Sequence, residues 1–208
     1  MIDIIDHLVY AVPDLESAVE ELERRLGVRA APGGRHPGEG TRNALVALGP
    51  ASYLEILAPD PRQSPPNRPL WLGLEGLARP RLAAWAIKAP DLEGLASRAA
   101  ESGVRLGPVI SGSRRRPDGV VLFWRFTDPH VVAADGLVPF LIDWGASPHP
   151  AGSAPGGASL AALRGEHPKS AGVAALLRSL GVELPVTKGP RSALIAVLET
   201  PNGLVELR

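Results

Sequence analysis

A succession of one strand, one helix and further strands recurs along this chain, and it constrains the fold more than any other feature of the sequence. Residues 4–12 form a β-rich run that leads through the letters PDLE, at residues 13–16, into apolar residues with helical spacing. Residues 82–89 lead through the same letters, at residues 90–93, into a second segment of this kind. Because self-similarity at a fixed spacing indicates repeated supersecondary units, we predict a fold built from repeated modules.

The ends of the predicted helices carry residue types that favour these positions. Asp14 and Asp91 precede the apolar stripes, where a carboxylate can accept hydrogen bonds from the free N–H groups of the first helical turn. Gly27 and Gly103 follow the stripes, and glycine readily adopts the left-handed conformation that ends a helix. These residues set the predicted bounds of the first two helices.

Three short strand-like runs follow each helix, so that every copy reads β-α-β-β-β. A third copy begins with residues 159–164, and its helix is predicted to stop at Gly181. The strand-like runs are residues 29–31, 43–48 and 52–57 in the first copy, 104–110, 120–126 and 138–144 in the second, and 182–186, 192–198 and 203–207 in the third. Stretches rich in Pro and Gly separate the copies. We predict modules at residues 1–58, 82–145 and 159–208, and linkers at residues 59–81 and 146–158.

The charge balance argues against several classes of partner. Lys and Arg together number 22, as do Asp and Glu, so the formal net charge is zero. A chain without an overall field does not attract nucleic acid or an anionic membrane, and we predict neither as a partner. No run approaches the roughly 20 apolar residues that span a bilayer, and the acidic N-terminus lacks the features of a signal peptide. We therefore expect a soluble, cytoplasmic protein.

The absence of cysteine limits the chemistry. Disulfides, thiolate nucleophiles and Cys-ligated zinc are excluded, so any metal must be bound by His, Asp or Glu. The sequence also has no Gly-x-Ser-x-Gly elbow, phosphate loop, dinucleotide fingerprint or His-Glu-x-x-His motif. What remains is a site built from histidine and carboxylate side chains.

Several short motifs resemble those of one superfamily. The opening DHLVYAVPDL at residues 6–15 is similar to the first module of vicinal oxygen chelate proteins, which include glyoxalase I, extradiol dioxygenases, fosfomycin-resistance enzymes, epimerases and metal-free antibiotic-binding proteins. Further motifs resemble the glyoxalase-like group within it: GGRHP at residues 33–37, GTRN at 40–43, YLE at 53–55, RPDG at 116–119 and PFLIDW at 139–144. The resemblance covers nearly the whole chain.

The resemblance implies an α+β fold in which repeated βαβββ modules form curled mixed sheets around a cleft. In that superfamily, metal ligands project inward from the first and fourth strands of each module, and His7 and Glu55 match this pair in the first module. His7 alternates with Ile5 and Val9, and Glu55 alternates with Tyr53, so both can face inward. Alternatively, His7 has only a structural role, as a buried histidine that is hydrogen-bonded to a neighbour.

The second copy departs from the superfamily pattern. Aligning the two PDLE segments places Ala84 opposite His7, so the second histidine is missing. Opposite Glu55, the second copy offers Asp143 or Ile142 according to register, and the third offers Glu206. The implied metal ligands are therefore His7 and Glu55, with Asp143 or Glu206 in support, and the implied ion is a divalent Zn, Fe, Mn or Ni. Asp143 also fits a structural hydrogen-bond acceptor.

Other candidates line the predicted cleft. Glu55 and His36 are the candidate catalytic residues, although a histidine in a Gly-rich loop is more often solvated. The candidate substrate-binding residues are Thr41, Asn43, Tyr53, Trp124 and Arg125. The last two alternate in one strand, so only one of them can face the cleft. Arg114, Arg115 and Arg116 are predicted to form an exposed arm, from which one arginine could clamp a carboxylate.

Two functions follow from these residues. The first is a divalent-metal-dependent enzyme of isomerase, lyase or dioxygenase type that acts on a small oxygenated substrate. The second is a metal-free protein that binds or sequesters a small molecule in the same cleft. Two modules of this type pair to form one cleft, so that the third module has no partner module within the chain. The extra module is therefore predicted either to cap the cleft or to pair across a homodimer.

Overall fold

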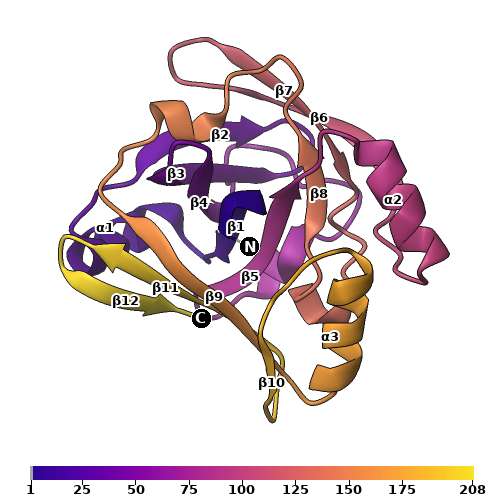
Figure 1. Cartoon of the computed structure of the whole chain (residues 1–208). Helices are drawn as coiled ribbons and strands as arrows, with labels where there is room; N and C mark the ends of the chain where they lie inside the picture. The colour runs from indigo at the N-terminus through magenta and orange to yellow at the C-terminus, as the bar shows by residue number, and fades with distance from the viewer. Residues whose placement is uncertain (1) are drawn as a thin grey trace.

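The computed structural model describes residues 2–208 and contains an eight-stranded closed barrel with a separate four-stranded sheet packed on its outside (Figure 1). The first module contributes β1 (Ile5–Ala11), α1 (Leu15–Leu26), β2 (Ala31–His36), β3 (Thr41–Gly49) and β4 (Ser52–Pro59). The second contributes β5 (Arg81–Lys88), α2 (Leu92–Glu101), β6 (Val109–Arg115), β7 (Val121–Thr127) and β8 (Phe140–Asp143). The predicted α+β class and curled sheets are confirmed.

Helix α1 begins and ends where the sequence predicts. The side chain of Asp14 accepts a hydrogen bond from the backbone N–H of Ser17, and Gly27 adopts a left-handed conformation with φ of 70°. Leu15, Val19 and Leu22 form the buried face of the helix. Asp91 caps α2 in the same way, by accepting from the N–H of Gly94.

The two modules share one strand order and meet at two seams to close the barrel. In each module the first strand pairs parallel with the fourth, as β1 does with β4 and β5 with β8. The modules join through the antiparallel pair β1 and β5 and through the contact of β2 with β6. The barrel order is β1-β4-β3-β2-β6-β7-β8-β5. Closure of this kind leaves an interior lined by alternate side chains of every strand.

The last unit has the element order β-α-β-β-β but a different strand order from the two barrel modules. It contains β9 (Ser159–His167), α3 (Ser170–Ser179), β10 (Val186–Lys188), β11 (Ala193–Thr200) and β12 (Gly203–Leu207). Here the first strand, β9, lies between β10 and β11, so the order is β10-β9-β11-β12. The first strand of each barrel module instead pairs with its fourth strand. The last unit is therefore a different arrangement of the same elements.

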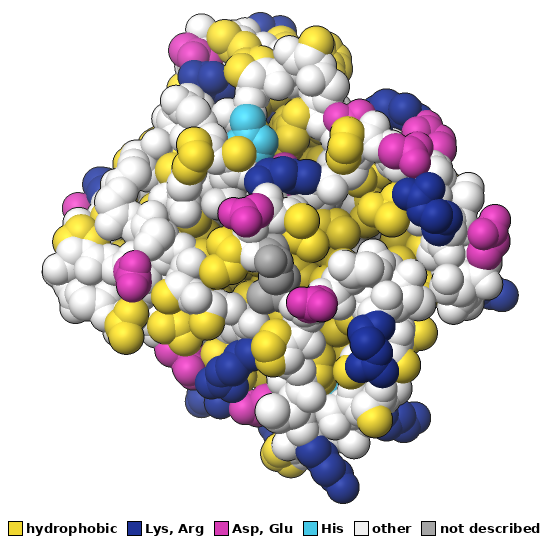
Figure 2. Space-filling view, in the orientation of Figure 1, with side chains coloured by type: hydrophobic (Ala, Val, Ile, Leu, Met, Phe, Trp, Pro, Cys, Tyr) yellow, Lys and Arg dark blue, Asp and Glu magenta, His cyan; other side chains and the backbone are white. Residues whose placement is uncertain are grey.

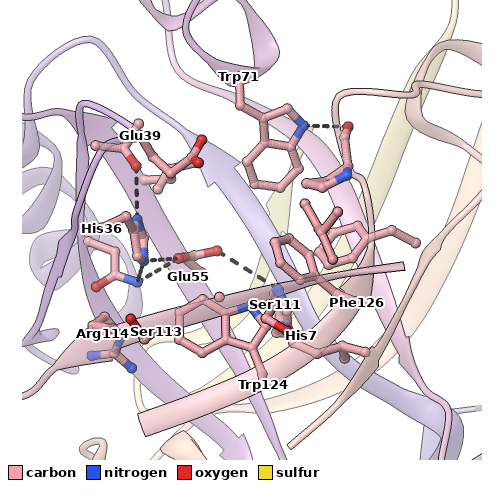
Figure 3. Close-up of a pocket in the computed structure, with 18 of the residues that line it drawn as sticks. His7, His36, Glu39, Glu55, Trp71, Ser111, Ser113, Arg114, Trp124 and Phe126 are labelled. Carbon is pink, nitrogen blue, oxygen red and sulfur yellow. Dashed lines mark hydrogen bonds and ion pairs between the residues drawn. The ribbon is translucent and has the colours of Figure 1, made fainter. Parts of the chain in front are cut away.

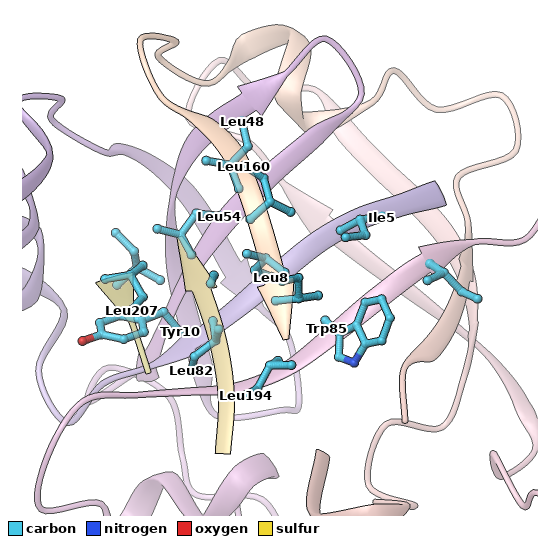
Figure 4. Packing of buried hydrophobic residues seen from close by; sticks show 14 of the residues in the cluster. Ile5, Leu8, Tyr10, Leu48, Leu54, Leu82, Trp85, Leu160, Leu194 and Leu207 are labelled. Carbon is cyan, nitrogen blue, oxygen red and sulfur yellow. The ribbon is translucent and has the colours of Figure 1, made fainter. Parts of the chain in front are cut away.

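The last unit covers the outside of the barrel and does not cap the cleft, which was the first of the two predicted alternatives; pairing across a homodimer stays a prediction. Leu8 and Trp85 point outward from β1 and β5 and are buried against Leu160 and Leu194 of the four-stranded sheet (Figure 4). The indole N–H of Trp85 donates to the carbonyl of Leu137 at 3.0 Å. Strand β1 is consequently buried at every position, on both of its faces.

The surface agrees with the balanced composition. On the face shown in Figure 2, basic and acidic side chains alternate around the periphery and no large area carries one sign of charge. Within residues 2–208, no helix combines the length and the apolar character that crossing a membrane requires.

Candidate functional site

The barrel interior encloses a cavity of about 220 Å³. The first module lines it with His7, His36, Thr41, Asn43, Tyr53, Glu55 and Leu57. The second module lines it with Ile110, Ser111, Gly112, Ser113, Arg114, Trp124, Phe126, Phe140, Ile142 and Trp144. Its mouth is bounded by Glu39, Arg68, Trp71 and His130, so the predicted linker 59–81 also covers the opening.

Glu55 lies at the centre of the polar side of the cavity (Figure 3). The side-chain amide of Asn43 donates to Glu55 Oε1 at 2.5 Å, which fixes one oxygen of the carboxylate. His36 Nε2 lies 3.8 Å from Oε1, and His7 Nε2 lies 3.8 Å from Oε2. Both separations exceed hydrogen-bonding distance. One carboxylate oxygen is therefore held by Asn43, and the other faces the cavity beside an imidazole.

His7 is oriented by a buried carboxylate next to it in the sequence. Its Nδ1 donates to Asp6 Oδ1 at 2.7 Å, and Asp6 also accepts from the indole of Trp144 at 3.1 Å and from His149 Nε2 at 3.1 Å. Burial raises the pKa of Asp6, but the hydrogen bonds and charges of His149 and His7 outweigh it and hold that pKa well below its ordinary value. Asp6 is thus an ionised acceptor, and its hydrogen bond to Nδ1 directs Nε2 of His7 toward the cavity.

His36 completes the polar side. Its Nδ1 donates to the hydroxyl of Thr41 at 2.8 Å, and its Nε2 accepts from Asn43 at 3.3 Å. Burial lowers the pKa of His36, an effect that the charge of Glu55 opposes, and the imidazole remains neutral at neutral pH. Burial also raises the pKa of Tyr53 well above its ordinary value, so its phenol stays protonated.

Arg114 is buried at one end of the cavity and is only 3% exposed. It donates to the carbonyl of Gly33. Among residues 2–208 no carboxylate forms an ion pair with it, and burial lowers the pKa of its guanidinium. The prediction that residues 114–116 form an exposed arm is therefore wrong for Arg114, because its side chain points into the barrel.

A wall of half-buried aromatic rings faces the polar side. The ring centroids of Trp124 and Phe126 lie 6.1 Å apart, those of Phe126 and Phe140 lie 6.4 Å apart, and those of Phe140 and Trp71 lie 5.6 Å apart. The wall touches the polar side at two points, where Phe140 meets His7 and Trp124 meets His36 edge to face. The cavity consequently has one polar and one aromatic side.

The structure brings most of the predicted site residues together and separates three from the rest. The residues that line the one cavity are His7, His36, Thr41, Asn43, Tyr53, Glu55 and Trp124. Arg125 points outward, where it pairs with Glu93 of α2. Asp143 accepts from the backbone of Gly145, and Glu206 pairs with Arg164 on the outer sheet.

The strand register explains why Asp143 is not the counterpart of Glu55. In the first module, Val9 pairs with Glu55 across the parallel ladder. The equivalent of Val9 is Ala86, and Ala86 pairs with Phe140. Phe140 therefore occupies the position of Glu55 in the second module. The sequence alternatives, Asp143 and Ile142, lie two or three residues too far along.

Three residues of the site were missed by the sequence analysis. The sequence places Asp6 only within a motif and Arg114 within a predicted exposed run, and it singles out His149 in no way. The local signal for Asp6 is a charged residue within an otherwise apolar strand, which is costly to bury unless it is paired. His149 carries no such signal, because the loop after β8 brings it back to Asp6.

The metal that the resemblance implies can be tested against these donors. His7 Nε2 and Glu55 Oε2 are 3.8 Å apart, which allows both to contact one ion at roughly 2.0–2.2 Å. Their second-module counterparts, Ala84 and Phe140, have no donor atoms. Within the described residues, no three His, Asp or Glu side chains form a group that could hold an ion. The donor set does not fit the implied site, which needs at least three protein ligands.

Comparisons with known proteins agree with this architecture. A family model described as a glyoxalase-like domain matches residues 5–181. The crystal structure of a hypothetical protein from Staphylococcus aureus superposes with a TM-score of 0.66 at 14% identity, and the match covers 97% of this chain and 83% of that protein. This match shows that the fold, including the outer sheet, occurs elsewhere. No curated protein sequence matches the chain.

Two methylmalonyl-CoA epimerases are more distant in structure. The enzyme from Mycobacterium tuberculosis is 22% identical with a TM-score of 0.43, and the match covers 68% of this chain and 86% of that one. A Streptomyces coelicolor enzyme, in complex with 2-nitronate-propionyl-CoA, is 23% identical with a TM-score of 0.46 and coverages of 69% and 96%.

Proposed function

The chain belongs to the glyoxalase-like domain family, within the vicinal oxygen chelate superfamily, and we propose that it is an enzyme of isomerase or lyase type that moves a proton on a small oxygenated substrate. One observation carries the proposal. The carboxylate of Glu55, which is 6% exposed, faces an enclosed cavity with one oxygen held by Asn43 and the other without a hydrogen-bond partner among residues 2–208. A buried carboxylate directed into a cavity in this way is suited to act as a general base.

The side chains around Glu55 support this role. Glu55 Oε2 takes a proton from a substrate carbon next to a carbonyl group, and the electron pair of the broken C–H bond remains on the substrate as an enolate. The proton returns to the same carbon, which gives epimerisation. In a hydroxyketone it can instead return to the former carbonyl carbon, once the hydroxyl proton has moved to the former carbonyl oxygen, which gives isomerisation. His7 Nε2, 3.8 Å from Oε2, can form a hydrogen bond with a substrate oxygen. The aromatic side excludes water and so strengthens these interactions.

A binding protein without catalysis is the second candidate. The half-buried aromatic wall favours it, since apolar surface of this extent can retain a ligand with no chemical step. The two candidates differ in whether a bound compound exchanges its carbon-bound protons with the solvent.

Solvent exchange tests the proposal directly. Hydroxyacetone and 2-hydroxyacetophenone each carry neighbouring oxygens and an acidic C–H group, and their exchange in D₂O can be followed by ¹H NMR. The protein should accelerate the exchange of at least one of them, and Glu55→Gln should reduce the acceleration by about 100-fold or more. Glu206→Gln, the matched control on the outer sheet, should retain the full rate. Binding of both compounds with exchange of neither would establish the second candidate.

Metal removal tests the hypothesis that the sequence favoured. We expect the exchange rate to be unchanged after dialysis against EDTA, because within the described part of the chain the cavity offers an ion only two convergent protein ligands. A rate that falls on dialysis and returns with Zn²⁺, Mn²⁺ or Ni²⁺ would show that the enzyme depends on metal. Metal analysis of His7→Ala and Glu55→Gln would then identify the ligands.

A further inference from the structure

The aromatic side of the cavity is apolar surface that the protein leaves unfilled. Trp71, Trp124, Phe126 and Phe140 remain half-buried inside the barrel, whereas outward side chains of β1 and β5, such as Leu8 and Trp85, are packed into the core. Neighbouring rings meet at interplanar angles of 59° to 83°. Aromatic rings prefer such tilted and edge-to-face contacts, so a further flat ring can continue the array at several points.

The size of the cavity limits the ligand. A volume of about 220 Å³ lies below the range of roughly 300–1,000 Å³ that drug-sized ligands occupy. The mouth is narrowed by the ion pair in which Arg68 donates to both oxygens of Glu39, and by Trp71, whose indole N–H donates to the carbonyl of Pro129 at 2.7 Å. One substituted ring fits such a space better than a fused ring system or a long chain.

The polar side presents an open acceptor, Glu55 Oε2, next to the aromatic wall. Within residues 2–208 this oxygen accepts no hydrogen bond, and the nearby amide of Asn43 is already used by Glu55 Oε1. A group placed against Glu55 Oε2 must therefore bring its own proton, and a carboxylate there would face Glu55 across a water-poor site.

Taking this cavity as the substrate site, and so resting on the proposed function, the geometry points to a substrate that carries one aromatic ring and a hydroxyl donor. The ring lies against Trp124 and Phe140, and the hydroxyl points to His7 Nε2 and Glu55 Oε2. An anionic head group is disfavoured at this end, although Arg114 lies elsewhere in the same cavity. Because the proposed proton transfer needs a carbonyl group as well, the substrate class is thus a small aryl hydroxyketone, and an aryl alcohol can serve as a binding probe.

Three compounds of matched size test the inference by binding alone. Benzyl alcohol has the ring and the donor, cyclohexylmethanol has the donor without the flat ring, and benzoate has the ring with a negative head group. In calorimetric titrations of the full-length protein, benzyl alcohol should bind about three- to tenfold more tightly than cyclohexylmethanol. It should bind at least about tenfold more tightly than benzoate. Equal or tighter binding of either competitor would overturn the inference.

Two neighbouring residues provide matched variants. Trp124 faces the cavity, whereas Phe123 is 62% exposed on the outer face of the same strand. Trp124→Leu should weaken benzyl alcohol binding by about three- to tenfold, and Phe123→Leu should leave it unchanged. Glu55→Gln should improve benzoate binding relative to benzyl alcohol, because the repelling charge is gone. Circular dichroism confirms that each variant is folded.

The outcomes separate this inference from the proposed function. Preferential binding of benzyl alcohol with no solvent exchange on any ketone would retain the substrate class and reject the catalytic role. Exchange on hydroxyacetone with no preference for the aromatic ring would do the opposite. Unchanged affinity in Trp124→Leu would reject the aromatic side as the ring site.

Discussion

The two barrel modules have one backbone plan but line the cavity with different chemistry. Strands of the first module direct His7, His36 and Glu55 inward, whereas strands of the second direct the aromatic rings of Trp124, Phe126 and Phe140 inward, together with Arg114. The difference is sharpest at symmetry-related positions, where Ala84 stands for His7 and Phe140 for Glu55. A repeated fold can therefore divide its work, with one half carrying polar groups for reaction and the other an apolar surface for binding.

The largest effect, a gain in metal affinity, should come from adding to the second module the histidine and carboxylate that it lacks. If Phe140 is the counterpart of Glu55, the double variant Ala84→His/Phe140→Glu places a second imidazole and carboxylate opposite the first pair. We expect its affinity for Zn²⁺ or Ni²⁺, measured by calorimetry, to rise on the order of 100-fold above that of the natural chain.

The pairing of β5 with β8 provides a control for this double variant. Ala84→His/Ile142→Glu introduces the same two side chains with the carboxylate two residues further along β8. It should gain much less affinity, since Ile142 pairs with Lys88 rather than with Ala86. Equal gains in both double variants would contradict the assigned equivalence of Phe140 and Glu55.

A smaller effect, on stability, should come from replacing the buried carboxylate of Asp6 in the first module. Asp6→Asn keeps the shape but places an amide against the N–H groups of His7, Trp144 and His149. We expect a loss of about 1–3 kcal/mol in the free energy of unfolding, measured in urea. Asp143→Asn, a half-exposed carboxylate at the end of β8, should cost less than about 0.5 kcal/mol.

The pH dependence of that loss has a definite sign. The pKa of Asp6 is lower in the folded chain than its ordinary value of 3.8, so its stabilising contribution is complete above that value. It disappears as the pH falls through the lower, folded-state pKa. The stability difference between the natural chain and Asp6→Asn should therefore be constant near neutral pH and shrink in strong acid. A difference that grows on acidification would show that Asp6 is not ionised.

The smallest effect is a change in the pKa of His36 when the charged side chains around it are replaced. Burial places the pKa of His36 below its ordinary value of 6.5, while Glu55 and, more weakly, Glu39 raise it and Arg114 lowers it. By NMR titration, Glu55→Gln should lower this pKa further and by more than Glu39→Gln, and Arg114→Met should raise it. Phe126→Leu, which removes a ring and no charge, serves as the control. A pKa that Glu55→Gln leaves unmoved would separate the two side chains electrostatically.

Much of the fold could be predicted from the sequence because its signals are local. The caps at Asp14 and Gly27 and the repeated PDLE segments fix the helices and the module order. The strand order of the last unit could not be predicted, since β-α-β-β-β is compatible with more than one pairing. Its position on the outside of the barrel depends on tertiary packing of Leu160 and Leu194 against β1 and β5.

The residues of the site likewise divide into those that local sequence signals predict and those that they do not. His7 and Glu55 are readable because alternation along a strand fixes which side chains share a face. The second-module counterpart of Glu55 could not be predicted, because β8 contains only residues 140–143 and follows an irregular segment with left-handed Ala134 and Asp135. A short strand after such a segment gives no pattern from which to count register. Asp6 and His149 meet across 143 positions of sequence, which no local signal reports.

The enclosure of β1 between the barrel interior and the outer sheet bears on how this protein can diversify. A strand with no solvent-facing position has little freedom to drift, so the polar groups that it holds are anchored by the same contacts that secure the outer sheet. Strand β7 is in the opposite situation, with Phe123 exposed beside Trp124. Adaptation to new ligands should therefore proceed through β7, while β1 and residues 159–208 are inherited together as one unit.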